Sequence, residues 1–255
     1  EKTLVVKQGW FTMAQEMAHW LRPSRALKKI TLYITPCIVN YPPSGRNCGL
    51  VNPANERLCG TELPYFPIGG PVPTPPPPDS DDVLRTTMWG GMEAGNGLLY
   101  RTQVIDGMVS EAGGHELLNI IAKLPEVEPG KKCRVGQTIC TTAAGSLRHN
   151  FSSILHTVPP FFSSDEWMPL LRSSYRGSLD LAWKMKMINL AVPLLGAGAR
   201  GAPVKEAARG AAESILEWDP CSSNVARRGD GLTLNFAVQS EEDIEIIEEA
   251  FESII

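Results

Sequence analysis

Two asparagines, Asn52 and Asn55, lie close together in the stretch LVNPANERLCG, residues 50–60, just after a short apolar run. Asparagine is a poor strand residue, and the proline that follows Asn52 cannot donate to a sheet ladder. A role other than sheet pairing must therefore explain two carboxamides at the end of a strand.

A glycine-rich turn is the strongest local signal for ligand binding. It follows an apolar strand and leads at once into a helix; it consists of Gly196, Ala197, Gly198, Ala199, Arg200 and Gly201. Glycine lets the backbone approach a ligand closely, and a helix N-terminus presents unpaired N–H groups and a positive dipole end. Together they make a phosphate cradle that needs no lysine. The turn lacks the Gly-Lys-Ser/Thr ending of a Walker loop, and a plain turn required by packing is the alternative.

Two further segments combine polar and small residues. Asp106 begins a helical segment in VIDGMVSEAGGHELL, residues 104–118, where an aspartate can serve as a simple N-cap. In residues 138–160 two strands flank a turn of small residues; the turn consists of Ala143, Ala144, Gly145 and Ser146. His156 lies in the second of these strands, which is apolar, so we expect a hydrogen-bonded core histidine rather than a catalytic one.

These residues must be positioned by strands that alternate with helices. The predicted strands are residues 3–7, 30–35, 48–51, 136–141, 153–158, 189–195 and 232–238. Apolar residues at i, i+3, i+4 spacing predict helices over residues 106–123, 178–188, 204–218 and 240–254. The alternation favours an α/β layered domain with a mostly parallel sheet. Ligands of such sheets usually lie at the carboxyl ends of the strands.

Composition limits the partners. The chain has 255 residues, 43% of them hydrophobic, which suffices for one large domain or for one domain with insertions. A net charge of −4 gives no basic excess for a nucleic-acid backbone or an anionic membrane, so neither is an expected partner. Any phosphate must therefore be bound mostly by backbone N–H groups and local dipoles.

The six cysteines show neither C-x-x-C spacing nor an accompanying histidine pair. This pattern favours free thiols in an intracellular protein, cytoplasmic or nuclear, over a zinc site or a disulfide framework. No apolar run approaches the roughly 20 residues of a membrane span. The chain starts at Glu1 rather than methionine, which indicates a trimmed chain from which a targeting segment can have been lost.

A proline-rich stretch at about residues 61–97 interrupts the alternation. It contains PYFPIGGPVPTPPPPDSDD and then WGGMEAGNG. Consecutive prolines favour extended polyproline II over helix or central strand, so we expect this stretch to be largely extended or mobile. It can be a solvated insertion, a lid over the site or a docking segment for a proline-reading partner.

Four motifs, in this order, resemble those of the macro domain family. LVNPANERL is similar to the family's IVNAAN strand end, and VIDGMVSEAGGHEL to its GVDxAIHxAAGxEL helix start. GQTICTTAAGSLRHNFSSILHTVPP resembles GxAxxTxGxxLxxxxVIHTVGP. YRGSLDLAWKMKMINLAVPLLGAGARGAPVKEAARGAAESI resembles YxxxLxxAxxxxxxSIAFPxIxTGxxGxPxxxAAxIAxxxI. The resemblance covers roughly residues 48–60 and 104–218, and residues 232–254 fit the family's last strand and helix.

The resemblance implies a three-layer α/β/α sandwich with a mixed, mostly parallel central sheet, here as a single domain over residues 1–255 with an insertion at about 61–97. The family binds ADP-ribose, and some members hydrolyse ADP-ribosyl esters. Asn55 would then bond the hydroxyls of the distal ribose, which suit a carboxamide because both donate and accept. Asn52 would shape the strand end, and Asp106 would orient or deprotonate a water. Backbone amides of residues 196–201 and 143–146 would hold the pyrophosphate, and Phe236 would contact the ligand.

The sequence also departs from the family pattern. The family's glycine loop after the asparagines is opened by the segment 60–103, and another insertion lies around residues 36–47. The family's early GDI aspartate, which grips adenine, is replaced by Gly9-Trp10-Phe11-Thr12, where Trp10 or Phe11 can stack on a base.

Three functions follow, none with a cofactor or a metal. The first is a module that binds ADP-ribose or a related adenine diphosphate nucleotide, free or on ADP-ribosylated proteins. The second is a hydrolase that removes ADP-ribose from an acidic side chain or dephosphorylates an ADP-ribose phosphate. The third is a degenerate macro-like scaffold whose proline-rich insertion recruits partners.

Overall fold

The computed structural model describes residues 4–6, 13–16, 27–35, 37–40, 42–43, 47–60, 104–220 and 231–254. The proline-rich stretch 61–97 lies outside the described residues, and so do Trp10, Phe11 and Cys221.

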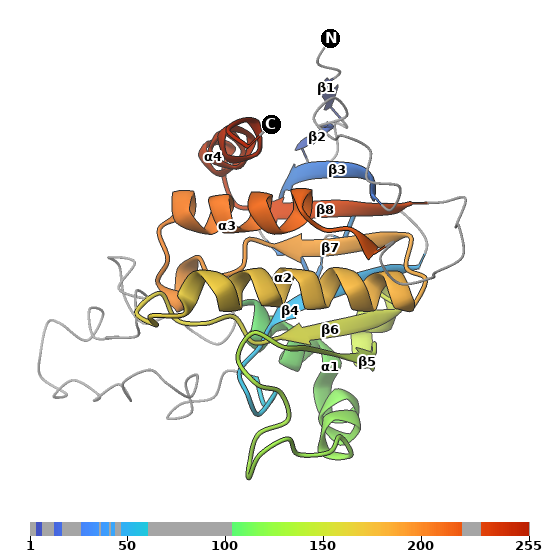
Figure 1. Ribbon diagram of the computed structural model, residues 1–255. Coiled ribbons are helices and arrows are strands. Elements are labelled where there is room, and N and C mark those ends of the chain that lie inside the picture. Colours follow the sequence, from blue (N-terminus) through green and yellow to red (C-terminus); the bar gives the residue numbers. More distant parts are fainter. Residues whose placement is uncertain are drawn as a thin grey trace, which may run out of the picture.

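The described strands form one eight-stranded mixed sheet (Figure 1). They are β1 (Leu4–Val6), β2 (Met13–Glu16), β3 (Leu27–Ile34), β4 (Cys48–Pro53), β5 (Thr138–Thr142), β6 (Ser153–Thr157), β7 (Asn189–Pro193) and β8 (Leu232–Val238). Their order is β1-β2-β3-β8-β7-β4-β6-β5. Five neighbouring strands are mutually parallel, namely β3, β8, β7, β4 and β6. At one edge β5 is antiparallel to β6, and at the other edge β2 is antiparallel to both β1 and β3. The predicted mixed, mostly parallel sheet is confirmed.

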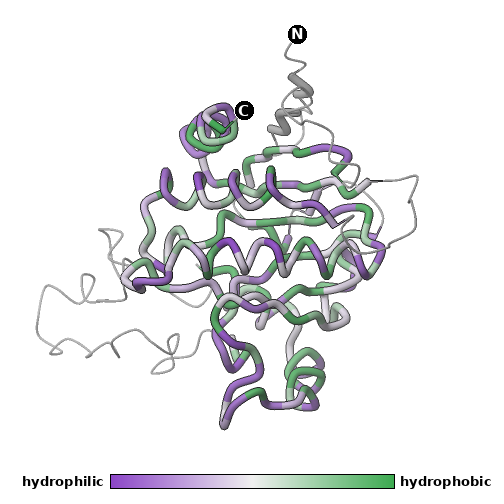
Figure 2. Tube along the Cα trace, in the orientation of Figure 1, coloured by the Kyte–Doolittle hydropathy of each residue, from purple (hydrophilic) through white to green (hydrophobic). Residues whose placement is uncertain are grey.

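Helices cover both faces of this sheet, which makes three layers. The apolar sides of α2 (Trp167–Lys184), α3 (Val204–Leu216) and α4 (Glu241–Glu252) share one buried cluster with one face of the strands. The other face packs against α1 (Ile105–Ala122) in a second cluster. In Figure 2 the strands are mostly hydrophobic, whereas hydrophobic and hydrophilic residues alternate along the helices. The predicted three-layer α/β/α sandwich is therefore confirmed.

Local signals explain most of the element boundaries. Ser240 and Asp243 form a capping box at α4, because each side chain accepts a hydrogen bond from the other's backbone N–H. The predicted start of α2 at residue 178 is wrong. The helix begins at Trp167. Pro169 does not interrupt it, because the proline lies in the first turn, where a missing backbone N–H is tolerated. The short strand β2 was not predicted.

Candidate functional site

The carboxyl edge of the parallel strands brings together four of the polar residues singled out by the sequence. β4 and β6 run side by side in the same direction, with Asn52 paired to His156 and Pro53 to Thr157. α1 begins at this edge, so Asp106 in its first turn lies beside the end of β4. The strand neighbours of Asn52 and His156, Val51 and Leu155, face the opposite cluster, so both polar side chains face α1.

Both oxygens of the buried Asp106 carboxylate accept hydrogen bonds from the two asparagines. Asn52 Nδ2 donates to Oδ1 over 2.8 Å, and Asn55 Nδ2 lies 3.4 Å from Oδ2. Negative charge in the first turn of a helix is favoured by the helix dipole. The family resemblance implied separate roles for these three residues, and the structure brings them into one hydrogen-bonded group.

Asn55 also organises the loop that follows it. Its Nδ2 donates to Gly60 O over 2.8 Å, and its Oδ1 accepts from the backbone N–H groups of Arg57 at 3.1 Å and Cys59 at 3.4 Å. The carboxamide thereby acts like an Asx turn that closes residues 55–60. Asn52 Oδ1, in contrast, is buried and has no hydrogen-bond partner among the described residues. Asn55 thus shapes the loop, while Asn52, for which the resemblance implied a role at the strand end, bonds Asp106 and His156 there.

His156 is a fully buried link between Asn52 and β5. Its Nδ1 lies 3.2 Å from Asn52 Nδ2, and its Nε2 lies 2.9 Å from Thr141 Oγ1. Since Asn52 Nδ2 can only donate, Nδ1 is the acceptor, and Nε2 carries the proton that Thr141 accepts. Burial lowers the pKa of His156 to about 4, so the ring is neutral at pH 7. The predicted hydrogen-bonded core histidine is confirmed, and Thr141 is a partner that the sequence did not reveal.

The free energy of unfolding should depend on pH in a way that reveals the neutral His156 ring. A histidine whose folded pKa lies below its unfolded value of about 6.5 contributes its full stability above pH 6.5 and loses it as the pH falls toward the folded value. With a folded pKa of about 4, the loss between pH 7 and pH 5 should be about 2 kcal/mol. Urea unfolding at both pH values measures it. His156→Gln should lose less stability over this range than the wild type, whereas the exposed His149→Gln should match the wild type. Equal losses in all three proteins would contradict the assignment.

The glycine-rich turn lies at the same edge, beyond the end of β7. Gly196, Gly198 and Gly201 have φ angles of 90°, 64° and 82°, which L-residues with side chains rarely adopt. Gly196 O accepts from Ala202 N, and Gly198 O accepts from Gly201 N, so the turn is held by its own backbone. Within the described part of the chain, no atom lies within 4 Å of a Cβ built on the exposed Gly198. The backbone here is open to a ligand, with α3 starting three residues after Gly201.

Arg200 connects this turn to the asparagine strand. It is only 6% exposed, and its Nη2 donates to Ala54 O over 2.8 Å. Its guanidinium lies 4.5 Å from the centre of the Phe161 ring, a cation–π contact. Burial lowers the pKa of Arg200 to about 10, while the charges of Asp106 and Glu56 act in the opposite direction. The guanidinium is therefore still charged at pH 7.

Comparisons with known proteins agree with this geometry. The macro domain family model matches residues 92–211. A macro domain-containing protein of Streptomyces griseus is 33% identical over 126 residues, which are 49% of this chain and 70% of that protein. One from Xanthomonas campestris is 32% identical over 148 residues, which are 53% of this chain and 80% of that protein.

The chain belongs to the macro domain family. Solved macro domains share its fold. An Oceanobacillus iheyensis macrodomain with ADP has a TM-score of 0.62 at 20% identity, over 94% of this chain and 97% of that one. A Trypanosoma brucei macrodomain in complex with ADP-ribose has a TM-score of 0.55 at 20% identity, over 86% and 68%.

One group of predicted ligand contacts is separated from the others in this macro domain. β5 runs antiparallel to β6, with Thr142 opposite Ser153, so the turn after β5 lies at the amino edge of the parallel strands. Gly145 and Ser146 contact Ala112, in the middle of α1, whereas Asp106 begins that helix. The expectation that this turn and residues 196–201 hold one pyrophosphate is therefore wrong. The residues concerned are Ala143, Ala144, Gly145 and Ser146.

Packing explains the composition of that turn. Ala143 and Ala144 are buried, and a Cβ on Gly145 would meet Ala112 O at 2.4 Å. Small residues are required there because the turn lies against α1. Phe236 is a core residue as well: it has no exposed surface and packs between Tyr175 and Phe251, so the ligand contact predicted for it has no support in the described fold.

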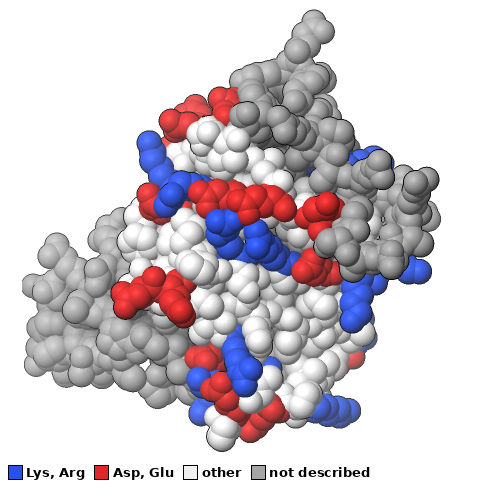
Figure 3. Space-filling model, viewed as in Figure 1, with Lys and Arg blue, Asp and Glu red and all other residues white. Residues whose placement is uncertain are grey.

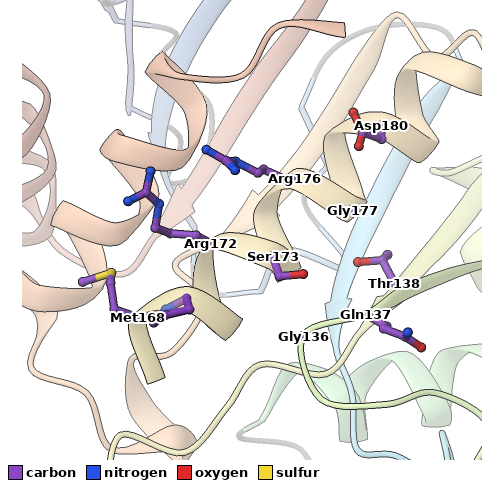
Figure 4. A pocket seen from close by; sticks show the side chains of 10 residues that line it. Gly136, Gln137, Thr138, Met168, Arg172, Ser173, Arg176, Gly177 and Asp180 are labelled. Atoms are coloured by element: carbon purple, nitrogen blue, oxygen red, sulfur yellow. The ribbon is translucent and has the colours of Figure 1, made fainter. Parts of the chain in front are cut away.

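A groove of about 680 Å³ lies elsewhere, between α2 and the start of β5 (Figure 4). Two arginines line it, but both extend toward α3, where Arg172 and Arg176 pair with Glu217. Figure 3 shows that oppositely charged residues lie next to one another across this face of the molecule. The groove therefore offers no uncommitted cation to an anionic ligand.

Other kinds of site are absent from the part of the macro domain that the structure describes. No group of three or more histidine, cysteine, aspartate or glutamate side chains is arranged to hold a metal ion. No described helix combines the length and the apolar character that crossing a membrane requires. The described cysteines are free thiols.

Proposed function

We propose that this macro domain binds ADP-ribose, as the free nucleotide or attached to a protein. The observation that carries the proposal is the open glycine-rich turn at residues 196–201, which lies before the N-terminus of α3 and beside the Asp106 group. The turn can donate backbone N–H groups to a pyrophosphate, and α3 adds its dipole. The solved macrodomains that contain ADP and ADP-ribose support the choice of ligand.

The distal ribose would lie on the side of β4 and α1. Asn55 Nδ2 already donates a hydrogen bond to the Asp106 carboxylate there. The unpaired Oδ1 of Asn52 is an acceptor that a water or a ligand hydroxyl can satisfy. The sugar would lie between the Asp106 carboxylate and the turn that contains Arg200. Its hydroxyls, which both donate and accept, could bond acceptors and donors of the site.

Hydrolysis of an ADP-ribosyl bond is the second candidate function. It is favoured by the fixed orientation of Asp106, since a carboxylate held by two carboxamides can orient or deprotonate one water without rearranging. The substrate would be an ADP-ribosyl ester of an acidic side chain or an ADP-ribose phosphate. The free thiols fit an intracellular setting for either function.

Calorimetric titration with ADP-ribose, compared with ADP, AMP and NAD, tests the binding proposal. We expect ADP-ribose and ADP to bind and AMP to bind much more weakly, because AMP lacks the pyrophosphate that the turn is suited to hold. NAD adds a cationic base at the distal ribose and should bind less tightly than ADP-ribose. Absence of heat with ADP-ribose in a folded protein would refute the proposal. It would leave the scaffold hypothesis, in which partners dock on the proline-rich insertion outside the described residues.

A further inference from the structure

Three consecutive residues beside the candidate site are each bonded to a different part of the fold. Ala54 N donates to the end of β6 over 2.7 Å, and Asn55 Nδ2 lies 3.4 Å from the Asp106 carboxylate at the start of α1. Glu56 O accepts hydrogen bonds over 2.7 and 3.1 Å from the backbone N–H groups of residues 132 and 133, in the connection between α1 and β5. The position of Asn55 therefore depends on that connection as well as on the sheet.

The Glu56 side chain also reaches this connection, where it is paired with Lys131. Glu56 Oε1 lies 2.8 Å from Lys131 Nζ, and the Glu56 side chain is only 7% exposed. Nearby, Lys131 and Arg134 both pair with Glu128, whose side chain is 41% exposed. Exposed ion pairs contribute little to stability, whereas loss of one partner from a buried pair leaves a buried charge that nothing compensates. The pair of Lys131 with Glu56 is therefore the one whose loss should affect the structure.

A tight turn fixes the position of Lys131. Val127 N donates to Lys131 O over 2.9 Å, and Lys131 N donates to Glu128 O over 2.8 Å. Gly130, between them, has a φ of 74°. The hydrogen bond to Glu56, followed by that to Glu128, raises the pKa of Lys131, so the ammonium is charged at pH 7. It lies between one buried and one exposed carboxylate.

Loss of the Lys131 charge should act on Asn55 through Glu56. A buried carboxylate without its cation is stabilised by turning toward water. Because Glu56 is buried and belongs to the loop 55–60, we expect its carboxylate to reach water only when that loop moves. Two contacts of the Asn55 carboxamide, with Asp106 Oδ2 and with one backbone N–H of the loop, are 3.4 Å long, so a small movement of the loop breaks them.

We propose that Lys131 is a positioning residue for the candidate site: its ion pair with Glu56 holds the loop 55–60 in the conformation in which Asn55 can bond a ribose. Lys131 acts through Glu56 and not through contact with the ligand. The inference rests on the proposed function, because it takes the distal ribose of ADP-ribose to lie beside Asn55.

Titrations of Lys131→Gln with ADP-ribose and with ADP test the proposal. ADP lacks the distal ribose, so its binding does not use Asn55. The variant should bind ADP-ribose about three- to tenfold more weakly, the loss expected for the hydrogen bonds of one carboxamide, while its affinity for ADP should change less than about twofold. A general disturbance of the fold would affect both ligands alike, so the ratio of the two affinities is the decisive readout.

Two single variants serve as controls. Lys131→Arg keeps the charge that Glu56 requires, so it should retain most of the wild-type preference for ADP-ribose. Arg134→Gln is the matched control, because it removes an exposed ion pair with Glu128 and leaves the pair of Glu56 with Lys131 intact. Its affinities for both ligands should equal those of the wild type.

Hydrogen–deuterium exchange measures the loop directly, without a ligand. The backbone N–H groups of Arg57 and Cys59 donate to Asn55 Oδ1, so their exchange should be faster in Lys131→Gln than in the wild type. Arg134→Gln should show wild-type exchange at both positions.

The double variant Glu56→Gln/Lys131→Gln tests the cause of the effect. It contains no unpaired buried charge, so it should recover most of the preference for ADP-ribose that Lys131→Gln loses. If Lys131→Gln alone is too unstable to titrate, the double variant should recover the fold as well. A failure to recover either one would overturn the inference, because the unpaired Glu56 carboxylate would then not be the cause.

The remaining outcomes separate this inference from the proposed function. Equal losses for ADP-ribose and ADP in folded Lys131→Gln, or no loss for either, would overturn the role of Lys131 and leave ADP-ribose binding intact. Absence of ADP-ribose binding to the wild type would refute the proposed function and with it the role of Lys131 in ligand binding.

Discussion

If the protein is a hydrolase, as proposed for its second candidate function, replacing Asp106 with alanine should lower the rate of ADP-ribosyl ester hydrolysis by about 10²–10⁴-fold while weakening ADP-ribose binding far less. Orientation of a water acts mainly in the transition state, whereas affinity comes mostly from the phosphates and the base. Asn55→Ala should have a similar effect, because its carboxamide holds both Asp106 and the loop 55–60. The measurement is release of ADP-ribose from an automodified glutamate substrate, alongside calorimetric affinity for ADP-ribose.

Asp106→Asn is the control for side-chain shape. It loses the charge and one of the two hydrogen bonds from the asparagines, so it should be nearly as inactive as Asp106→Ala if the carboxylate acts on water. Cys59→Ala controls for the nearest alternative nucleophile. The Cys59 thiol lies 3.6 Å from Asn55 Oδ1, and burial raises its pKa, so little reactive thiolate is present. Activity that survives Asp106→Ala and Asn55→Ala but disappears in Cys59→Ala would overturn the assignment.

Replacing Gly198 with glutamate should abolish ADP-ribose binding. The residue is exposed at the turn, and a Cβ there meets no atom of the described residues within 4 Å, so the new side chain would enter the space proposed for the phosphates. It adds both bulk and a negative charge, which would repel the ligand. Calorimetry measures the affinity, and circular dichroism verifies the fold.

Gly198→Ser separates this effect from backbone strain. Serine has the same difficulty with a φ of 64°, which costs roughly 1–2 kcal/mol, but it brings no charge and little bulk. It should therefore retain measurable binding. Undiminished affinity in folded Gly198→Glu would mean that the phosphates lie elsewhere.

The sequence allowed prediction of most elements because local signals and tertiary packing agree in them. The apolar stripe of α3, the Ser240 cap of α4 and the apolar run of β7 each correspond to an element that the structure contains. The start of α2 was missed because a proline in a first turn reads like a breaker when helical position is unknown. β2 is only four residues long and shows little pattern.

Strand direction explains the largest error in the site. Grouping residues 143–146 with 196–201 assumed that both turns follow strands of the same direction. Only ten residues separate β5 from β6, and parallel neighbours need a crossover of a dozen or more, so the short connection was a usable signal for an antiparallel pair. Side-chain contacts are a different matter. No spacing rule connects Arg200 with Ala54, 146 positions earlier in the chain, because that contact arises only when β7 and β4 become neighbours.

The contact between Gly60 and α1 bears on how this chain can change in evolution. A Cβ on Gly60 would lie 2.6 Å from Ser110 Cβ, in the second turn of α1, which begins at Ile105. Gly60 and the start of α1 are therefore close together in space. For a flexible connection between such fixed points, each doubling of length adds only about 0.6 kcal/mol to the closure cost. A change of length between two such points therefore alters the closure cost little. Because both points lie at the carboxyl edge of the sheet, any new sequence acquired there starts next to the site. The same scaffold can thus diversify its ligands without redesign of its core.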